Sequence, residues 1–147
     1  MASVLIVFGS TGGNTELVTD EVAQILNEQK HKVTVQRAEL TNESDLSNYN
    51  YIILGSSTYG QGLLQEHMAK FIYSVKDLKG KKCAAIGLGD SKYNIEYVVE
   101  AAKILEEQIK EKGGEILQPA LRINKTPVTY LNTNVKDWAE KLSKLLQ

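Results

Sequence analysis

The stretch that decides the fold is ASVLIVFGSTGGNT, residues 2–15. Its first half, residues 2–8, is a continuous apolar run rich in β-branched side chains, which predicts a strand buried on both faces of a sheet. Its second half is a glycine-rich turn, and residues 14–30 then carry apolar side chains at helical spacing. A buried strand that turns directly into a helix is typical of an α/β sheet.

The same alternation continues along the chain. Further strands are predicted at residues 33–37, 51–55, 82–88 and 115–121. Further helices are predicted at residues 64–76, 95–112 and 132–146, and Gly113 and Gly114 close the helix at residues 95–112. Strands and helices alternate five times, so we expect one α/β domain over residues 1–147, a three-layer structure with a doubly wound, five-stranded parallel sheet. Ligands of such sheets bind beyond the carboxyl ends of the strands. The loops to inspect are therefore residues 9–15, 56–62 and 87–94.

Composition excludes several classes of function. Hydrophobic residues make up 42% of the 147 residues, charged residues 24%, and the net charge of −1 argues against general nucleic-acid binding. No apolar run approaches the roughly 20 residues of a membrane span, and the first residues lack the basic region of a signal peptide, so we expect a cytoplasmic protein. The single cysteine, Cys83, lies in an apolar run and is expected in the core. His31 and His67 have no partners at metal-ligand spacing, so no metal is expected.

The first loop has the composition of a phosphate-binding turn. A helix N-terminus presents unpaired N–H groups and attracts anions, and glycine lets the backbone approach a ligand. Hydroxyl and amide side chains add donors; the candidate residues are Ser10, Thr11, Gly12, Gly13, Asn14 and Thr15. The loop has no Lys or Arg, so hydrogen bonds and the helix dipole would hold the phosphate. The alternative is a plain turn capped by Asn14 or Thr15. The spacing fits neither a P-loop nor a dinucleotide fingerprint.

The second and third loops each contain glycines and one tyrosine. The candidate residues are Ser57, Thr58, Tyr59, Gly60, Gln61 and Gly62 in the second loop, and Leu88, Gly89, Asp90 and Tyr93 in the third. Two tyrosines at neighbouring strand ends can clamp a flat ring. Each tyrosine taken alone is better explained as a surface residue. Together with the first loop, the pair favours a planar, phosphorylated ligand.

These three loops resemble the FMN-binding loops of flavodoxins. Residues 10–15 resemble the phosphate loop, residues 57–60 the loop whose aromatic side chain covers one face of the flavin, and residues 87–93 the loop whose tyrosine stacks on the other face. The chain lacks the insertion in the fifth strand of long-chain members, so it resembles the short-chain type. That resemblance implies a sheet with strand order 2-1-3-4-5.

The resemblance also implies a function. The chain would be a low-potential, one-electron carrier that binds FMN non-covalently and shuttles electrons between redox partner proteins, docking transiently as a monomer. Ser10, Thr11, Asn14, Thr15 and either Ser57 or Thr58 would hold the phosphate. Tyr59 and Tyr93 would sandwich the ring, and Asp90 would face its pyrimidine edge. The carbonyl of the Gly60–Gln61 peptide would turn toward the ring nitrogen that is protonated after one-electron reduction.

Two departures from the family pattern affect the details. Gln61 stands where relatives often have an acidic residue, and Tyr59 where they often have tryptophan. Without a carboxylate at position 61, we expect a somewhat less negative second reduction potential. The chain is also nearly neutral, with its acidic excess in residues 1–70. Docking to basic redox partners would then be weaker or would use that half. The rim candidates over the whole chain are Glu16, Asp20, Glu66, Glu96 and Glu100, unless these are ordinary solvated charges.

Three other functions remain open. A flavodoxin-like FMN or quinone reductase would need open space beside the flavin, which a stacked Tyr93 would fill. A dedicated activator of one partner enzyme, such as a ribonucleotide reductase, typically has ring loops poor in tyrosine. A binding module of the same fold would hold no flavin at all.

Overall fold

The central sheet has the predicted parallel order. The computed structural model describes residues 2–90 and 99–146. Five strands lie in the order β2-β1-β3-β5-β6, where β2 is Lys32–Arg37, β1 is Ser3–Gly9, β3 is Tyr51–Tyr59, β5 is Lys82–Gly89 and β6 is Glu115–Ile116. These strands pair in parallel, with Val35, Ile6, Ile53 and Ala84 in one row across the sheet. The doubly wound α/β class is confirmed.

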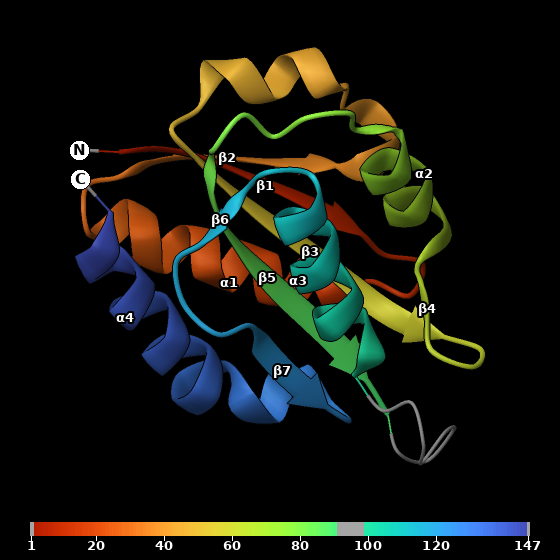
Figure 1. Cartoon of the computed structure of the whole chain (residues 1–147). Helices are drawn as coiled ribbons and strands as arrows, with labels where there is room; N and C mark the ends of the chain where they lie inside the picture. The colour runs from red at the N-terminus through yellow and green to blue at the C-terminus, as the bar shows by residue number, and fades with distance from the viewer. Residues whose placement is uncertain (1, 91–98, 147) are drawn as a thin grey trace.

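Helices cover both faces of this sheet (Figure 1). Helices α1 (Asn14–Glu28) and α4 (Lys136–Leu145) pack on one face, and α2 (Glu66–Ser74) and α3 (Glu100–Glu111) pack on the other. Strand β1 supplies both cores, since Val4 and Ile6 face the first pair of helices and Leu5 and Val7 face the second. A strand covered on both faces needs apolar residues at every position, which is the pattern that the sequence shows.

The fifth strand is the main error of the sequence prediction. Residues 115–121 do not form one strand; β6 ends at Ile116, and a separate strand, β7 (Leu121–Asn124), pairs in parallel with the end of β5. Pro119 has no N–H for a strand ladder. Its carbonyl instead accepts a hydrogen bond from Trp138 Nε1 at 2.8 Å, while the Ala120 N–H donates to Glu106 Oε2 at 3.0 Å. The chain therefore leaves the sheet to fix α4 and α3, and then returns.

Helix ends differ from the predictions by a few residues. The last helix was expected from residue 132, but Leu131–Val135 forms a π-helical turn and α4 begins at Lys136. Residues 95–98 of the predicted third helix lie outside the described part of the chain, and α3 begins at Glu100. The predicted glycine cap is confirmed, because Gly113 has φ 82° and the Gly114 N–H donates to the Ile109 carbonyl at 2.8 Å.

Several short elements escaped prediction, among them the 3₁₀ segment Pro127–Tyr130 after β7. Two 3₁₀ segments, Ala38–Leu40 and Glu43–Asn48, connect β2 to β3. Strand β4 (Leu63–Leu64) folds back antiparallel onto the end of β3, pairing Leu63 with Tyr59. Two residues are too few to show a period of two in sequence. Within residues 2–90 and 99–146, no helix has the length and apolar character needed to cross a membrane.

Candidate functional site

A cleft of about 520 Å³ opens at the carboxyl ends of β1, β3, β5 and β7. Its walls come from four loops, and the lining residues are Ser10, Gly12, Asn14, Thr15, Ser57, Thr58, Tyr59, Gly60, Leu88, Gly89, Asp90, Lys125 and Thr126. The three loops selected from the sequence therefore meet at one place. Thr11, Gly13, Gln61 and Gly62 belong to the same loops without lining the cleft. Tyr93 lies outside the described residues.

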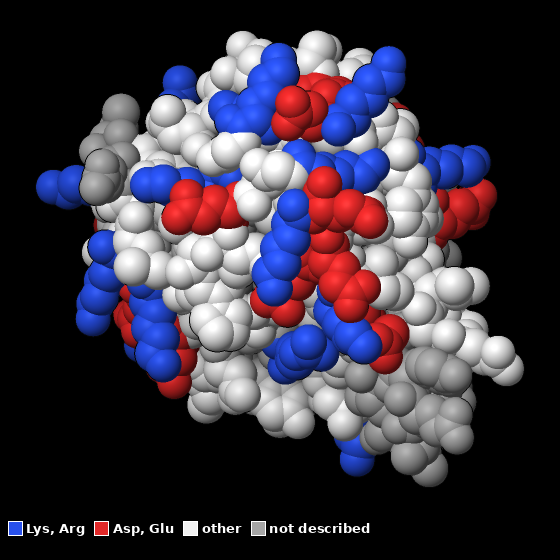
Figure 2. All heavy atoms as spheres, viewed as in Figure 1, with Lys and Arg blue, Asp and Glu red and all other residues white. Residues whose placement is uncertain are grey.

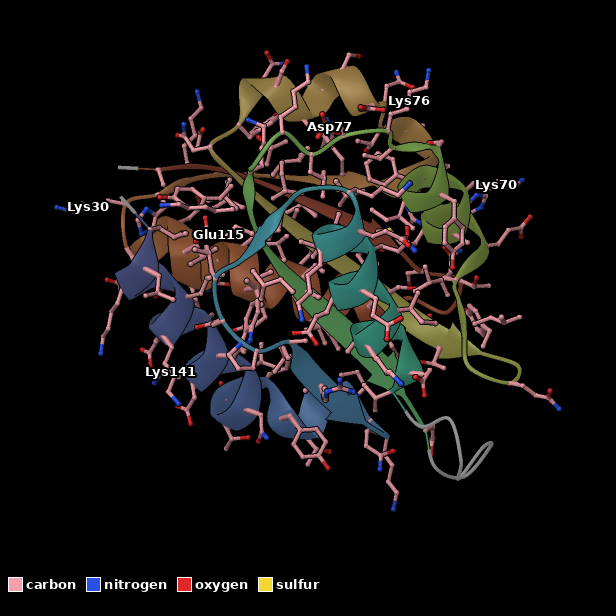
Figure 3. The ribbon with its side chains drawn as sticks, viewed as in Figure 1. Lys30, Lys70, Lys76, Asp77, Glu115 and Lys141 are labelled. Carbon is pink, nitrogen blue, oxygen red and sulfur yellow. The ribbon has the colours of Figure 1, made fainter. Side chains whose placement is uncertain are left out.

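A second hollow of about 480 Å³ lies at the opposite end of the sheet, between the 3₁₀ segment Glu43–Asn48 and the chain that leads into β5. Charged side chains such as Glu43, Asp77 and Lys79 line it, and Figure 3 shows Asp77 and the neighbouring Lys76 at that end of the molecule. None of the site residues predicted from the sequence lines this hollow. The candidate site is therefore the first cleft.

The first loop leads into α1 without a side-chain cap. Gly13 is the N-cap residue with φ 88°, a left-handed conformation that favours glycine, and no described side chain caps the helix. The alternative to a phosphate-binding turn, a plain turn capped by Asn14 or Thr15, is therefore wrong. Ser10 Oγ accepts the Gly13 N–H at 2.9 Å, which closes the turn. The first-turn N–H groups of α1 therefore have no side-chain cap among the described residues, which is the condition that an anion site at a helix N-terminus requires.

Thr15 has the most informative hydroxyl in the cleft. Its side chain has a relative exposure of 0%, and its Oγ1 has no hydrogen-bond partner among the described residues. Thr15 nonetheless lines the cleft. Burying a hydroxyl without a hydrogen-bond partner costs about 1–3 kcal/mol of folding free energy. We therefore expect a ligand atom to form the hydrogen bond that Thr15 Oγ1 lacks.

Arg37 places a cation beside this loop, which the sequence prediction missed. At the end of β2, its Nη1 donates to the Ser10 carbonyl at 3.5 Å, and its guanidinium lies 5.3 Å from the centre of the Phe8 ring. Glu16 at 3.1 Å and Glu39 at 3.8 Å form ion pairs with it. Because these two carboxylates offset its charge, Arg37 holds the loop without making it strongly positive.

The second loop is a tight hairpin between β3 and β4. Gly60 and Gly62 have φ 55° and 86°, so the turn needs glycine at both positions. Tyr59 precedes the turn, lines the cleft and is 39% exposed. The Thr58 hydroxyl accepts the Ala101 N–H at 3.0 Å and so also fixes the start of α3.

The third loop is shaped by packing as well as by the cleft. A Cβ on Gly87 would lie 2.5 Å from the Ala102 nitrogen, and a Cβ on Gly89 would lie 2.5 Å from the Val99 nitrogen. Both glycines therefore let α3 approach β5 closely. Asp90 follows at the mouth of the cleft and is partly exposed.

A fourth loop, after β7, completes the cleft and was not selected from the sequence. Lys125 and Thr126 line the cleft there, and the Lys125 N–H donates to the Gly89 carbonyl at 2.8 Å. The fifth strand was predicted to end at residue 121, so this loop was not recognised as a strand end. A strand placed at 121–124 would have revealed it.

Comparison with known proteins agrees with this geometry. The sequence model of the family described as flavodoxin matches residues 6–138. The chain belongs to the flavodoxin family. It is 33% identical over 130 residues to probable flavodoxin 2 of Bacillus subtilis, covering 86% of this chain and 85% of that protein. The crystal structure of oxidised flavodoxin 2 from Bacillus cereus superposes with a TM-score of 0.88 at 33% identity, covering 97% and 99% of the two chains.

A more distant structure has the same fold. A Fusobacterium nucleatum flavodoxin bound to flavin mononucleotide superposes with a TM-score of 0.87 over 100% of both chains, at 16% identity. In the present flavodoxin only residues 117–120 separate β6 from β7, so the fifth strand lacks a long insertion. The chain is therefore of the short-chain type. Among the described residues, no group of three or more His, Cys, Asp or Glu side chains is arranged to hold a metal ion.

Proposed function

We propose that the cleft binds one FMN non-covalently and that the protein carries single electrons between redox partner proteins. Family membership makes this flavodoxin an FMN-based electron carrier rather than an enzyme. Bound FMN supplies the one-electron chemistry, and the residues of the chain bind the cofactor, orient it and exclude water. The main support for placing the phosphate at the start of α1 is the buried Thr15 hydroxyl, which has no hydrogen-bond partner among the described residues.

The phosphate end of the cofactor fits the start of α1. In the described part of the chain, Thr15 Oγ1 has no partner and the first turn of α1 has no side-chain cap. Ser10, Asn14 and Ser57 line the same cleft. A Cβ added to Gly12 would meet no atom of residues 2–90 or 99–146 within 4 Å, so these residues leave open space on that side of the loop. Backbone and hydroxyl donors at a helix N-terminus bind phosphate without a full countercharge.

The ring end of the cofactor fits the loops after β3, β5 and β7. Tyr59 offers an aromatic face, and Asp90 with the backbone of Leu88 and Gly89 offers polar atoms to the pyrimidine edge. The Gly60–Gln61 peptide lies in a turn with glycine at both ends, which favours rotation of its carbonyl. The stacking role of Tyr93 remains a prediction.

Replacing Thr15 by valine tests the phosphate placement. The valine fills the same buried space without the hydroxyl, so FMN should bind about 10- to 100-fold more weakly, the loss of one hydrogen bond to a charged group. Riboflavin, which lacks the phosphate, should bind to this variant with the same affinity as to the unmodified protein. Thr19→Val is the matched control, because Thr19 is also 0% exposed on α1 but its hydroxyl already donates to the Glu16 carbonyl at 3.1 Å. Equal losses for FMN and riboflavin in Thr15→Val would contradict this placement.

Partner docking is proposed at the rim of the cleft, with only a modest electrostatic component. Three predicted rim carboxylates are paired, Glu16 with Arg37, Glu66 with Lys70 at 3.6 Å and Glu100 with Lys103 at 3.8 Å. Burial, reinforced by the charge of Glu16, raises the pKa of Asp20. Glu96 lies outside the described residues.

The surface charges support weak steering. Positive and negative side chains are interspersed on the face shown in Figure 2 rather than collected into one acidic patch. Exposed apolar side chains near the cleft, Leu63 at 63% and Val128 at 60%, offer contact area instead. Association rates with a redox partner should therefore fall with salt by less than tenfold between low and physiological ionic strength.

Two assays separate the proposed carrier from the alternatives. A stepwise reductive titration followed by absorption should show a blue one-electron-reduced form before bleaching, and NAD(P)H should not be oxidised without a partner. Direct two-electron bleaching with steady NAD(P)H oxidation would identify a reductase. We also propose a cytoplasmic monomer, which gel filtration and cell fractionation test.

A further inference from the structure

We propose that Gln65 is a positioning residue that turns the Thr11 hydroxyl toward the phosphate of the bound cofactor. This inference rests on the proposed FMN site. Gln65 was not among the residues selected from the sequence, and it does not line the cleft. It lies directly before α2, and its side chain is 1% exposed.

The helix fixes which way the Gln65 amide points. Its Oε1 accepts hydrogen bonds from the N–H groups of His67 at 2.9 Å and Met68 at 3.1 Å, so it caps the first turn of α2. A carbonyl oxygen can accept these two bonds, whereas an amide NH₂ group cannot. The Gln65 NH₂ group must therefore face away from α2.

On that opposite side lies the phosphate loop. Gln65 Nε2 donates to Thr11 Oγ1 at 3.4 Å, across 54 positions of sequence. A hydroxyl that accepts a bond from an amide directs its own proton elsewhere. Thr11 does not itself line the cleft, but it is exposed in the loop that leads into α1, so its proton can turn toward an anion bound at the start of that helix.

The surroundings hold this arrangement rigidly. The Gln65 backbone N–H donates to Ser56 Oγ at 2.9 Å, a bond buried beneath the second loop. A Cβ added to Gly9 would overlap Gln65 Oε1, so the first loop can pass over the amide only with glycine there. Gln65 thus joins three parts of the site, namely the phosphate loop, the end of β3 and the start of α2.

Gln65→Glu separates positioning from helix capping. A glutamate keeps the acceptor for His67 and Met68, and these two N–H groups with the helix N-terminus offset part of the cost of burying a carboxylate. The apoprotein should therefore remain folded with a lowered melting temperature, which is measured before the affinities are compared. The variant loses the donor to Thr11, whose hydroxyl then donates to the carboxylate instead of the phosphate. FMN should bind at least tenfold more weakly while riboflavin binding changes less than twofold. Gln36→Glu is the control for an added charge, because Gln36 Oε1 also accepts a hydroxyl proton, from Thr41 at 3.1 Å.

A double-mutant cycle tests whether Gln65 acts through Thr11. In a Thr11→Val background, Gln65→Glu should lose most of its effect on FMN affinity, and Thr11→Ser should keep the wild-type affinity. If the Gln65→Glu effect is undiminished in the Thr11→Val background, or if FMN and riboflavin weaken equally, the inference is wrong. If the unmodified apoprotein binds no FMN, the proposed function itself has failed.

Discussion

Lys125 lines the cleft and is held in a conformation that lysine rarely adopts. Its φ is 74°, its N–H donates to the Gly89 carbonyl at 2.8 Å, and its side chain is exposed. A left-handed conformation costs a non-glycine residue about 1–2 kcal/mol. Lys125→Gly relieves that strain and keeps the backbone hydrogen bond, so the apoprotein should gain about 1 kcal/mol, or roughly 2–4 °C in melting temperature.

The same substitution removes a positive charge from the lining of the cleft where we propose that the flavin binds. A unit charge on the order of 10 Å away contributes about 0.4 kcal/mol in water-like surroundings and about 1.7 kcal/mol at an effective dielectric constant of 20. For one electron, these energies correspond to about 20–70 mV. Because reduction adds negative charge, losing Lys125 should make the second potential more negative by that amount.

Two further variants separate strain from charge. Lys125→Gln removes the charge and keeps the strained backbone, so it should shift the potential without raising the melting temperature. Lys79→Gly is the matched control, since Lys79 also has a left-handed backbone, φ 53°, and is exposed at the opposite end of the sheet. It should stabilise the protein and leave both potentials unchanged. Spectroelectrochemical titration and thermal melting measure the two effects, and an unchanged potential in both Lys125 variants would refute the electrostatic reasoning.

Three other predictions follow from single sites. Gly87→Ala should destabilise the apoprotein by about 1–3 kcal/mol in urea unfolding, because the new Cβ would lie 2.5 Å from the Ala102 nitrogen. Gly12→Ala should leave the stability unchanged, because no described atom lies within 4 Å of its new Cβ, and equal effects of the two substitutions would contradict the close packing at Gly87. Burial raises the pKa of the Cys83 thiol to about 12, so native protein at pH 8 should resist alkylation, and rapid alkylation would be inconsistent with that burial. The free energy of unfolding should decline as the pH rises above about 9, because the thiol of the unfolded chain ionises there while the buried thiol does not. Gln61→Asp should lower the second reduction potential, and the expectation fails if that potential does not move.

The sequence predicted the sheet and three of the four cleft loops because both follow from local patterns. Apolar runs such as residues 2–8 specify buried parallel strands, and the fold then brings their carboxyl ends together. The prediction of the fifth strand failed because the chain bends where the Pro119 carbonyl accepts a hydrogen bond from Trp138, and the spacing of apolar residues gives no sign of that contact. That error concealed Lys125 and Thr126.

The missed supporting residues share a different cause. Arg37 and Gln65 touch the phosphate loop from 27 and 54 positions away in sequence. Each also has an ordinary local explanation, Arg37 as a polar strand end and Gln65 as a helix cap. Only their packing in three dimensions shows that they contact the loop, so sequence patterns alone give no signal for them.

These contacts bear on how the cofactor binds. Ser10 Oγ accepts the Gly13 N–H, Arg37 donates to the Ser10 carbonyl, and Gln65 donates to Thr11, so these hydrogen bonds within the protein fix the first loop, where we propose that the phosphate binds. Thr15 alone keeps a buried hydroxyl without a partner among the described residues. A loop ordered in advance pays little conformational entropy on binding, and an unsatisfied donor gains its full hydrogen bond. The phosphate should therefore contribute more of the binding free energy than its few contacts suggest, and FMN should bind far more tightly than riboflavin.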